Sequence, residues 1–200
     1  MAKLLIKILC IFLFLSLCLN NTYGSGVGIE LLGLNMHLID SAVEWGKRSP
    51  HKLDDGGRFL YLPGLEVYYE WDAREGKIFN ADGYRFTIAS YLDTMDRHSG
   101  YIHLGLRYTF PFDSGRQLSI GFGPSLFFRE TWSVFPDYEK HQLLVESDSF
   151  LPGYEHMWLV FGDVDYQYRI SKDLKLVVSM LPAIPYSILF SIGILWENKI

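Results

Sequence analysis

The stretch GYIHLGLRYT, residues 100–109, alternates between two kinds of side chain. From residue 102 onward its even positions carry large, mostly apolar groups, including Ile102 and Leu104, and its odd positions carry aromatic, small or polar groups, including His103 and Arg107. Alternation with a period of two is typical of a β-strand whose two faces have different surroundings. This stretch therefore predicts a strand with one bulky aliphatic face and one face that is small, aromatic or ionisable.

The same alternation recurs in residues 117–129 and 187–197. After residue 25 no stretch has the roughly 18 apolar residues of a membrane helix. A soluble sandwich would also alternate, but a large aliphatic face opposite a glycine-rich, ionisable one is typical of a strand with lipid outside and a polar interior. Tryptophans near the strand ends fit a membrane-interface belt; they are Trp71, Trp132, Trp158 and Trp196.

Eight such segments predict an all-β fold, an eight-stranded antiparallel transmembrane β-barrel of the outer membrane. The long polar gaps at 40–58 and 132–153 follow odd-numbered strands, and the connections at 112–115 and 171–172 are tight. The long loops then lie at the extracellular end and both termini in the periplasm. The expected strands are 27–39, 59–72, 83–94, 99–111, 116–131, 154–170, 173–182 and 186–197.

Residues 1–24 are expected to be a signal peptide, and residues 25–200 the barrel domain. Lys3 and Lys7 precede a 12-residue apolar run at 8–19, which is too short to cross a bilayer as a helix, and Gly24 ends a small-residue cleavage pattern. A membrane anchor is the alternative for this segment. The signal peptide would direct export of the chain, most simply in a Gram-negative cell, and its cleavage would remove both cysteines.

Composition excludes several classes of protein. The chain has 200 residues, which suits one domain, and its 49% apolar and 16% aromatic content argues against disorder. Lys+Arg 18 against Asp+Glu 23 gives a net charge of −5, which argues against a nucleic-acid partner. An eight-stranded lumen is too narrow for a porin-like channel. We expect a monomer, and the sequence contains no spacing that predicts a metal or a cofactor.

The residues that favour chemistry lie at the ends of two odd-numbered strands. His37 ends the first expected strand, and the pair Asp93-Thr94 ends the third. Both ends are predicted to reach the extracellular rim. An imidazole, a carboxylate and a hydroxyl at one rim suit base-assisted acyl transfer. The alternative is an ordinary solvated barrel mouth.

The order and spacing of several short motifs resemble the PagP family of lipid A palmitoyltransferases, which are eight-stranded outer-membrane enzymes. That family has a histidine at the extracellular end of the first strand, a Trp-Asp turn after the second and an Asp-Ser pair ending the third. The similar motifs here are Leu34-Asn35-Met36-His37, Glu70-Trp71-Asp72, Tyr91-Leu92-Asp93-Thr94, Arg129-Glu130-Thr131-Trp132 and Met180-Leu181-Pro182.

The resemblance implies transfer of a palmitoyl-like chain from a phospholipid to the lipid A of lipopolysaccharide. His37 would act as general base, Thr94 as hydroxyl partner or nucleophile, and Asp93 as the orienting carboxylate. Threonine replaces the family's serine, the family's helix before the barrel is missing, and the loops differ, so the acceptor cannot be carried over.

Two further roles follow from the same resemblance. Gly105, at the spacing of a family glycine that sets acyl length, would leave room for the methyl end of the chain. Pro63 and Pro182, which cannot donate a ladder hydrogen bond, would open lateral gates for lipid; the alternative is that these prolines simply start strands or mark turns. Apart from the resemblance, the other inward charges are expected to pair across the lumen.

Two rival functions remain. One is a non-catalytic small barrel whose long loops bind partners or stabilise the outer membrane. The other is a lipid A deacylase barrel, which is disfavoured because no His-x-Ser motif ends a strand.

Overall fold

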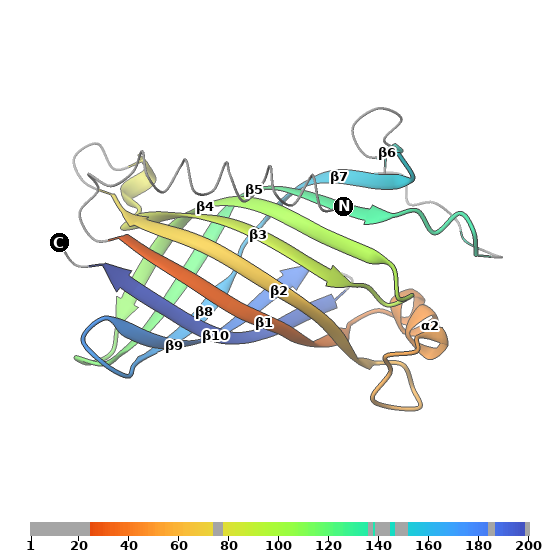
Figure 1. Cartoon of the computed structure of the whole chain (residues 1–200), viewed down its shortest axis with the longest axis horizontal. Helices are drawn as coiled ribbons and strands as arrows, with labels where there is room; N and C mark the ends of the chain where they lie inside the picture. The colour runs from red at the N-terminus through yellow and green to blue at the C-terminus, as the bar shows by residue number, and fades with distance from the viewer. Residues whose placement is uncertain are drawn as a thin grey trace.

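The computed structural model describes residues 25–73, 78–135, 138, 145–146, 152–183 and 187–198. Most of these residues belong to one antiparallel sheet (Figure 1). The expected signal peptide at 1–24 lies outside the described residues. The strands are β1 (Ser25–His37), β2 (Phe59–Asp72), β3 (Gly83–Leu92), β4 (His98–Pro111), β5 (Arg116–Glu130), β6 (Val145–Glu146), β7 (Tyr154–Phe161), β8 (Val164–Arg169), β9 (Leu174–Ala183) and β10 (Ser187–Asn198).

The sheet closes into a barrel because β1 pairs with β2 on one side and with β10 on the other. The remaining neighbours follow chain order, and β4 pairs with β5. Strands β7 and β8 share one position beside β5, β7 along its second half and β8 along its first. The result is the eight-stranded antiparallel barrel that the sequence predicts.

The strand expected at 154–170 is interrupted at Gly162 and Asp163. The backbone amide of Gly121 on β5 donates to the carbonyl of Asp163 at 2.8 Å. A Cβ added at Gly121 would lie only 1.6 Å from Oδ1 of Asp163. The glycine therefore leaves the space into which Asp163 turns its carboxylate, at a local break that alternation alone does not predict.

The first strand ends at His37 rather than at residue 39, and the gap at 40–58, expected to be loop, contains the helix α2 (Asp40–Arg48). Asp40 lies in its first turn and Lys47 and Arg48 in its last, which suits the helix dipole. Figure 1 shows α2 at the end of the barrel opposite the short β4–β5 and β8–β9 turns. The short-turn end of such barrels faces the periplasm, so α2 is extracellular.

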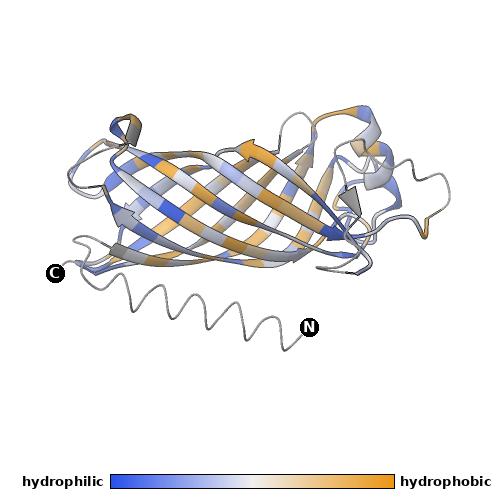
Figure 2. Cartoon of the chain, turned by 90° about the horizontal axis from the view of Figure 1, so that it is seen from above, coloured by the Kyte–Doolittle hydropathy of each residue, from blue (hydrophilic) through white to orange (hydrophobic). Residues whose placement is uncertain are grey.

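The outside of the barrel is aliphatic and the inside is largely polar, as the alternation predicts. Leu104 on β4 is 49% exposed, whereas Arg107 on the same strand is 4% exposed. Figure 2 shows hydrophobic and hydrophilic residues alternating along the strands. Within the described residues, no helix is both long and apolar enough to cross a membrane.

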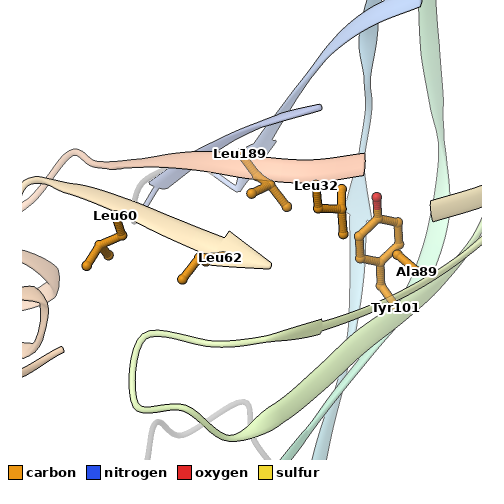
Figure 3. Close-up of a cluster of buried hydrophobic side chains, with 6 residues drawn as sticks. All are labelled: Leu32, Leu60, Leu62, Ala89, Tyr101 and Leu189. Carbon is orange, nitrogen blue, oxygen red and sulfur yellow. The ribbon is translucent and has the colours of Figure 1, made fainter. Parts of the chain in front are cut away.

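The lumen is divided into an apolar half and a charged half. An apolar cluster lies toward the extracellular end (Figure 3), with Tyr91, Phe127 and Leu181 packed against it, and its Tyr101 donates a hydrogen bond to Glu66. Nearer the periplasm, Arg85 and Arg107 bind the carboxylates of Asp163, Asp165 and Glu70. The apolar cluster consists of Leu32, Leu60, Leu62, Ala89, Tyr101 and Leu189.

Candidate functional site

The structure brings His37 and Thr94 together at the extracellular rim. His37 is the last residue of β1, and Thr94 lies in the turn that follows β3. The imidazole Nε2 lies 3.5 Å from the Thr94 hydroxyl oxygen, and both side chains are buried. A base and a hydroxyl from two strands that are not neighbours in the sheet therefore meet inside the barrel mouth. Their catalytic roles stay predictions.

His37 is covered from the extracellular side. Its backbone amide donates to the carbonyl of Arg58 at 2.8 Å, which ties the end of β1 to the segment before β2. Gly46 of α2 lies above the imidazole: a Cβ added there would be 2.8 Å from Nδ1 of His37 and 1.9 Å from the carbonyl oxygen of Gly57. The helix can approach this closely because residue 46 has no side chain.

Asp93 accepts four hydrogen bonds, none of them from His37 or Thr94 among the described contacts. The amides of Met95 and Arg97 donate to one oxygen at 2.9 and 3.0 Å, and the Trp132 indole and Ser99 hydroxyl donate to the other at 2.9 and 3.1 Å. Burial raises the pKa of the Asp93 carboxyl, although these donors act in the opposite direction. Asp93 shapes the turn that carries Thr94 and does not contact the base.

Trp132 was expected in the membrane-interface belt, and that expectation is wrong. Its side chain is 7% exposed, because it packs inside the rim against Trp45 of α2, with ring centroids 5.1 Å apart. The guanidinium of Arg129 lies 4.3 Å from its ring centroid. The Arg-Glu-Thr-Trp motif at 129–132 marked this position, but only the packing shows that Trp132 binds Asp93. Trp158 and Trp196 are 70% and 66% exposed, as a lipid-facing belt requires.

The space beside Gly105 is taken by a neighbouring side chain. A Cβ added at Gly105 would lie 2.4 Å from Nε2 of His103, whose Nδ1 is 2.7 Å from the Ser125 hydroxyl. The cavity nearby measures about 10 Å³ and is lined partly by polar residues, among them Glu66 and Thr87. About one water molecule fits such a volume. The role predicted for Gly105 thus has no acyl-sized space in this conformation.

Pro63 and Pro182 both lie where an interstrand ladder ends. The β2–β3 ladder begins at Gly64, directly after Pro63, and the β1–β2 register shifts beside the same residue. The described β8–β9 ladder ends at Met180, two residues before Pro182. Pro63 lacks the amide needed to continue its ladder. The β8–β9 ladder ends where β8 itself begins, at Val164, and the β9–β10 ladder continues through Pro182 to Ala183. The gating role of the two prolines stays a prediction.

The expected pairing of inward charges is found. Near the rim, Arg129 Nη2 lies 3.2 Å from Oε2 of Glu155. The sequence predicted an inward Arg129 but did not single out Glu155. Glu155 is fully buried and also accepts from Tyr138 at 3.0 Å. Its position in the alternation of 154–161 was the available signal. Within the described residues, no group of three or more His, Cys, Asp or Glu side chains could hold a metal ion.

Comparison with solved structures shows the fold. NspA, a Neisserial surface protein, matches with a TM-score of 0.51 at 9% identity, over 88% of this chain and 97% of its own. The chain is an outer-membrane β-barrel. Ail of Yersinia pestis, solved with the heparin analogue sucrose octasulfate, has a TM-score of 0.49 at 10% identity, over 88% of this chain and 99% of its own. The N-terminal barrel domain of Pseudomonas aeruginosa OprF has a TM-score of 0.43 at 12% identity, over 86% of this chain and 97% of its own.

No protein-family model matches the chain, and no curated protein matches its sequence. At these identities the structural likeness concerns the fold and carries no activity. The resemblance to the PagP family therefore stays a prediction from the motifs.

Proposed function

We propose that this barrel transfers an acyl chain from an outer-leaflet phospholipid to lipid A, with His37 as general base. The observation that carries the proposal is the 3.5 Å contact between His37 Nε2 and the Thr94 hydroxyl, both buried above the apolar half of the lumen. A nucleophile and a base within or near hydrogen-bond reach are what acyl transfer requires, and such contacts are often long before substrate binds.

In the proposed reaction His37 takes the proton of the attacking hydroxyl, either that of Thr94 or that of the acceptor. The oxygen attacks the ester carbonyl carbon of the phospholipid, the bond to the glycerol oxygen breaks, and that oxygen receives the proton from His37. If Thr94 attacks first, a second round passes the acyl group from Thr94 to the lipid A hydroxyl. Asp93 contributes by holding the turn that presents Thr94, not by contacting the imidazole.

The main demand on this proposal is space. Ligand pockets usually measure about 300–1,000 Å³, far more than the cavity of about 10 Å³ beside Tyr101 and Leu189. An acyl chain would have to displace side chains of the apolar cluster, among them Tyr101, which donates a hydrogen bond to Glu66. The ladder interruptions beside Pro63 and Pro182 are the points at which it would enter.

A second candidate is a non-catalytic barrel whose extracellular segments bind a partner or stabilise the membrane. The observation that favours it is the filled lumen together with the helix over His37. On this proposal His37 and Thr94 are buried structural groups, and α2 with Trp45 forms part of an ordered platform.

Mass spectrometry of lipid A distinguishes the two candidates. Cells that express the wild type should carry lipid A with one added acyl chain, and His37→Ala should abolish the addition. Thr94→Ala should lower it, whereas Thr94→Ser keeps the hydroxyl and should retain it. His156→Ala, a histidine on β7 outside this site, is the matched control and should behave as the wild type.

Each variant must be found folded in the outer membrane by its heat-dependent shift in gel mobility. Lipid A of unchanged mass in cells that contain folded wild-type barrel would contradict acyl transfer and favour the non-catalytic barrel.

A further inference from the structure

A second cluster of polar side chains lies on the outer face of the barrel near its extracellular end. The Ser90 hydroxyl oxygen on β3 is 2.8 Å from Nε2 of His98 on β4. Nδ1 of His98 is 3.0 Å from the hydroxyl of Tyr154, and that hydroxyl donates to Glu130 Oε1 at 3.3 Å. Four strands, β3, β4, β5 and β7, thus contribute one residue each to a continuous hydrogen-bonded chain.

From this geometry we propose that Ser90 and His98 form a second, independent catalytic site that hydrolyses ester bonds of outer-leaflet lipids. Ser90 is the nucleophile and His98 the general base. Tyr154 and Glu130 are positioning residues that hold the imidazole. The site shares no residue with the cluster of His37 and Thr94, so the inference does not depend on the acyl-transfer proposal.

The hydrogen-bond chain has a consistent direction. Glu130 can only accept while ionised, so the Tyr154 proton points to it and the phenol oxygen is free to accept from His98. His98 then carries its proton on Nδ1, which leaves Nε2 as an acceptor facing Ser90. This is the tautomer in which a histidine can remove the proton of a serine. Arg97 Nη1 lies 3.4 Å from the other oxygen of Glu130.

The position of the cluster favours a lipid substrate. Strand alternation sends Thr87 and Ala89 into the lumen, where both are buried, and therefore sends Ser90 outward. Leu92, the next outward residue of β3, is 36% exposed. The ring of Phe128 lies 6.1 Å from that of His98, in the space left by a glycine on β4. An ester at the boundary between acyl chains and head groups can reach a hydroxyl in such surroundings.

The Phe128 ring also depends on one backbone position. A Cβ added at Gly100, which pairs with Ser90 across β3 and β4, would lie 2.6 Å from Cζ of Phe128. Glycine at this position lets an apolar ring lie beside the serine and histidine. The apolar surroundings of the serine and histidine therefore depend on the absence of a side chain at residue 100.

The proposed reaction needs water as its co-reactant. The Ser90 oxygen attacks the ester carbonyl carbon while His98 Nε2 takes the Ser90 proton. The bond between that carbon and the alcohol oxygen breaks, and the proton passes to the departing lysolipid. Water then attacks the acyl-Ser90 ester, gives a proton to His98, and the carboxylic acid leaves as the proton returns to Ser90.

The test uses the full barrel reconstituted in phosphatidylethanolamine vesicles. We expect free fatty acid to be released and a fluorophosphonate probe to label one serine. Ser90→Ala should abolish both the label and the release, and His98→Ala should slow the release by about 10²–10⁴-fold. Ser114→Ala, which removes an exposed hydroxyl from the periplasmic turn, is the matched control and should change neither.

Tyr154→Phe separates a catalytic role from a structural one. It removes the hydroxyl while keeping the ring, so kcat should fall with little change in KM if Tyr154 orients the base. His37→Ala should retain the release of fatty acid, which distinguishes this site from the one at the rim. The proposal is overturned if the folded wild type releases no fatty acid, or if Ser90→Ala is labelled and active like the wild type.

Discussion

Arg85 is the residue that holds the charged half of the lumen together. Its guanidinium, 1% exposed, binds Asp163 at 2.5 Å and also contacts Glu70 and Asp165. It lies over the ring of Tyr68, 3.9 Å from the centroid. A buried cation of this kind stabilises chiefly because the carboxylates around it would otherwise be unpaired, and an unpaired buried charge is far more costly than an unpaired surface one.

Replacing Arg85 should therefore be among the more damaging substitutions. Arg85→Leu leaves three carboxylates facing one guanidinium, and the free energy of unfolding should fall by about 3–5 kcal/mol. Urea titration of the barrel in vesicles measures it. Arg116→Leu is the control, since Arg116 pairs with Asp113 in an exposed turn. Equal losses for the two variants would show that the buried network does not carry the stability assigned to it.

At the scale of elements, α2 closes the mouth because it can lie close to the segment before β2. The contact depends on Gly46, which faces the carbonyl of Gly57 and the His37 imidazole. The helix has only nine residues, and a helix this short has little stability of its own in water. Its order therefore comes from docking against the rim.

Gly46→Val should detach the helix while leaving the barrel folded. The added side chain overlaps the Gly57 carbonyl, so α2 must move outward, and trypsin should cleave after Lys47 or Arg48 faster than in the wild type. The rate of cleavage in intact vesicles is the measurement. Ser41→Ala, at an exposed position of the same helix, should leave the rate near that of the wild type. Unchanged cleavage in Gly46→Val would mean that the helix tolerates the side chain.

At the scale of the whole molecule, stability comes from lipid around an aliphatic exterior and from closure of the sheet, since a barrel has no unpaired edge in the bilayer. The rows of outward residues include Leu31, Leu104 and Ile192, which are 62%, 49% and 52% exposed. In water these rows would promote aggregation, whereas in a bilayer they contact the apolar acyl chains of the lipids.

A charged side chain on this surface should make the free energy of folding less favourable, and more so the nearer it lies to the middle of the bilayer. Leu104→Arg places a guanidinium on the lipid face near the middle of β4, and the free energy of folding into vesicles should be less favourable by about 2–4 kcal/mol. Leu53→Arg, at a position 61% exposed in the segment after α2, lies outside the bilayer and should cost little. If both substitutions cost the same, the outward face of β4 does not contact lipid.

The pattern of residues along the chain was enough to predict the barrel and the inward direction of His103 and Arg107, because a strand's alternation is local and lipid imposes the same rule on every strand. The positions of His37 and Thr94 at the ends of strands could likewise be predicted, whereas their catalytic roles stay predictions. The interruption at Asp163 could not be predicted, since it depends on the space beside Gly121 on another strand.

Only the tertiary structure decided which groups touch. Asp93 could be placed beside Thr94 from the sequence, but its partner Trp132 follows β5, which only the pairing of β4 with β5 brings near. The packed state of the lumen, and the outward chain from Ser90 through His98, depend in the same way on how strands distant in sequence are staggered. Side-chain direction follows from the neighbouring residues of one strand, whereas contact requires the register of several.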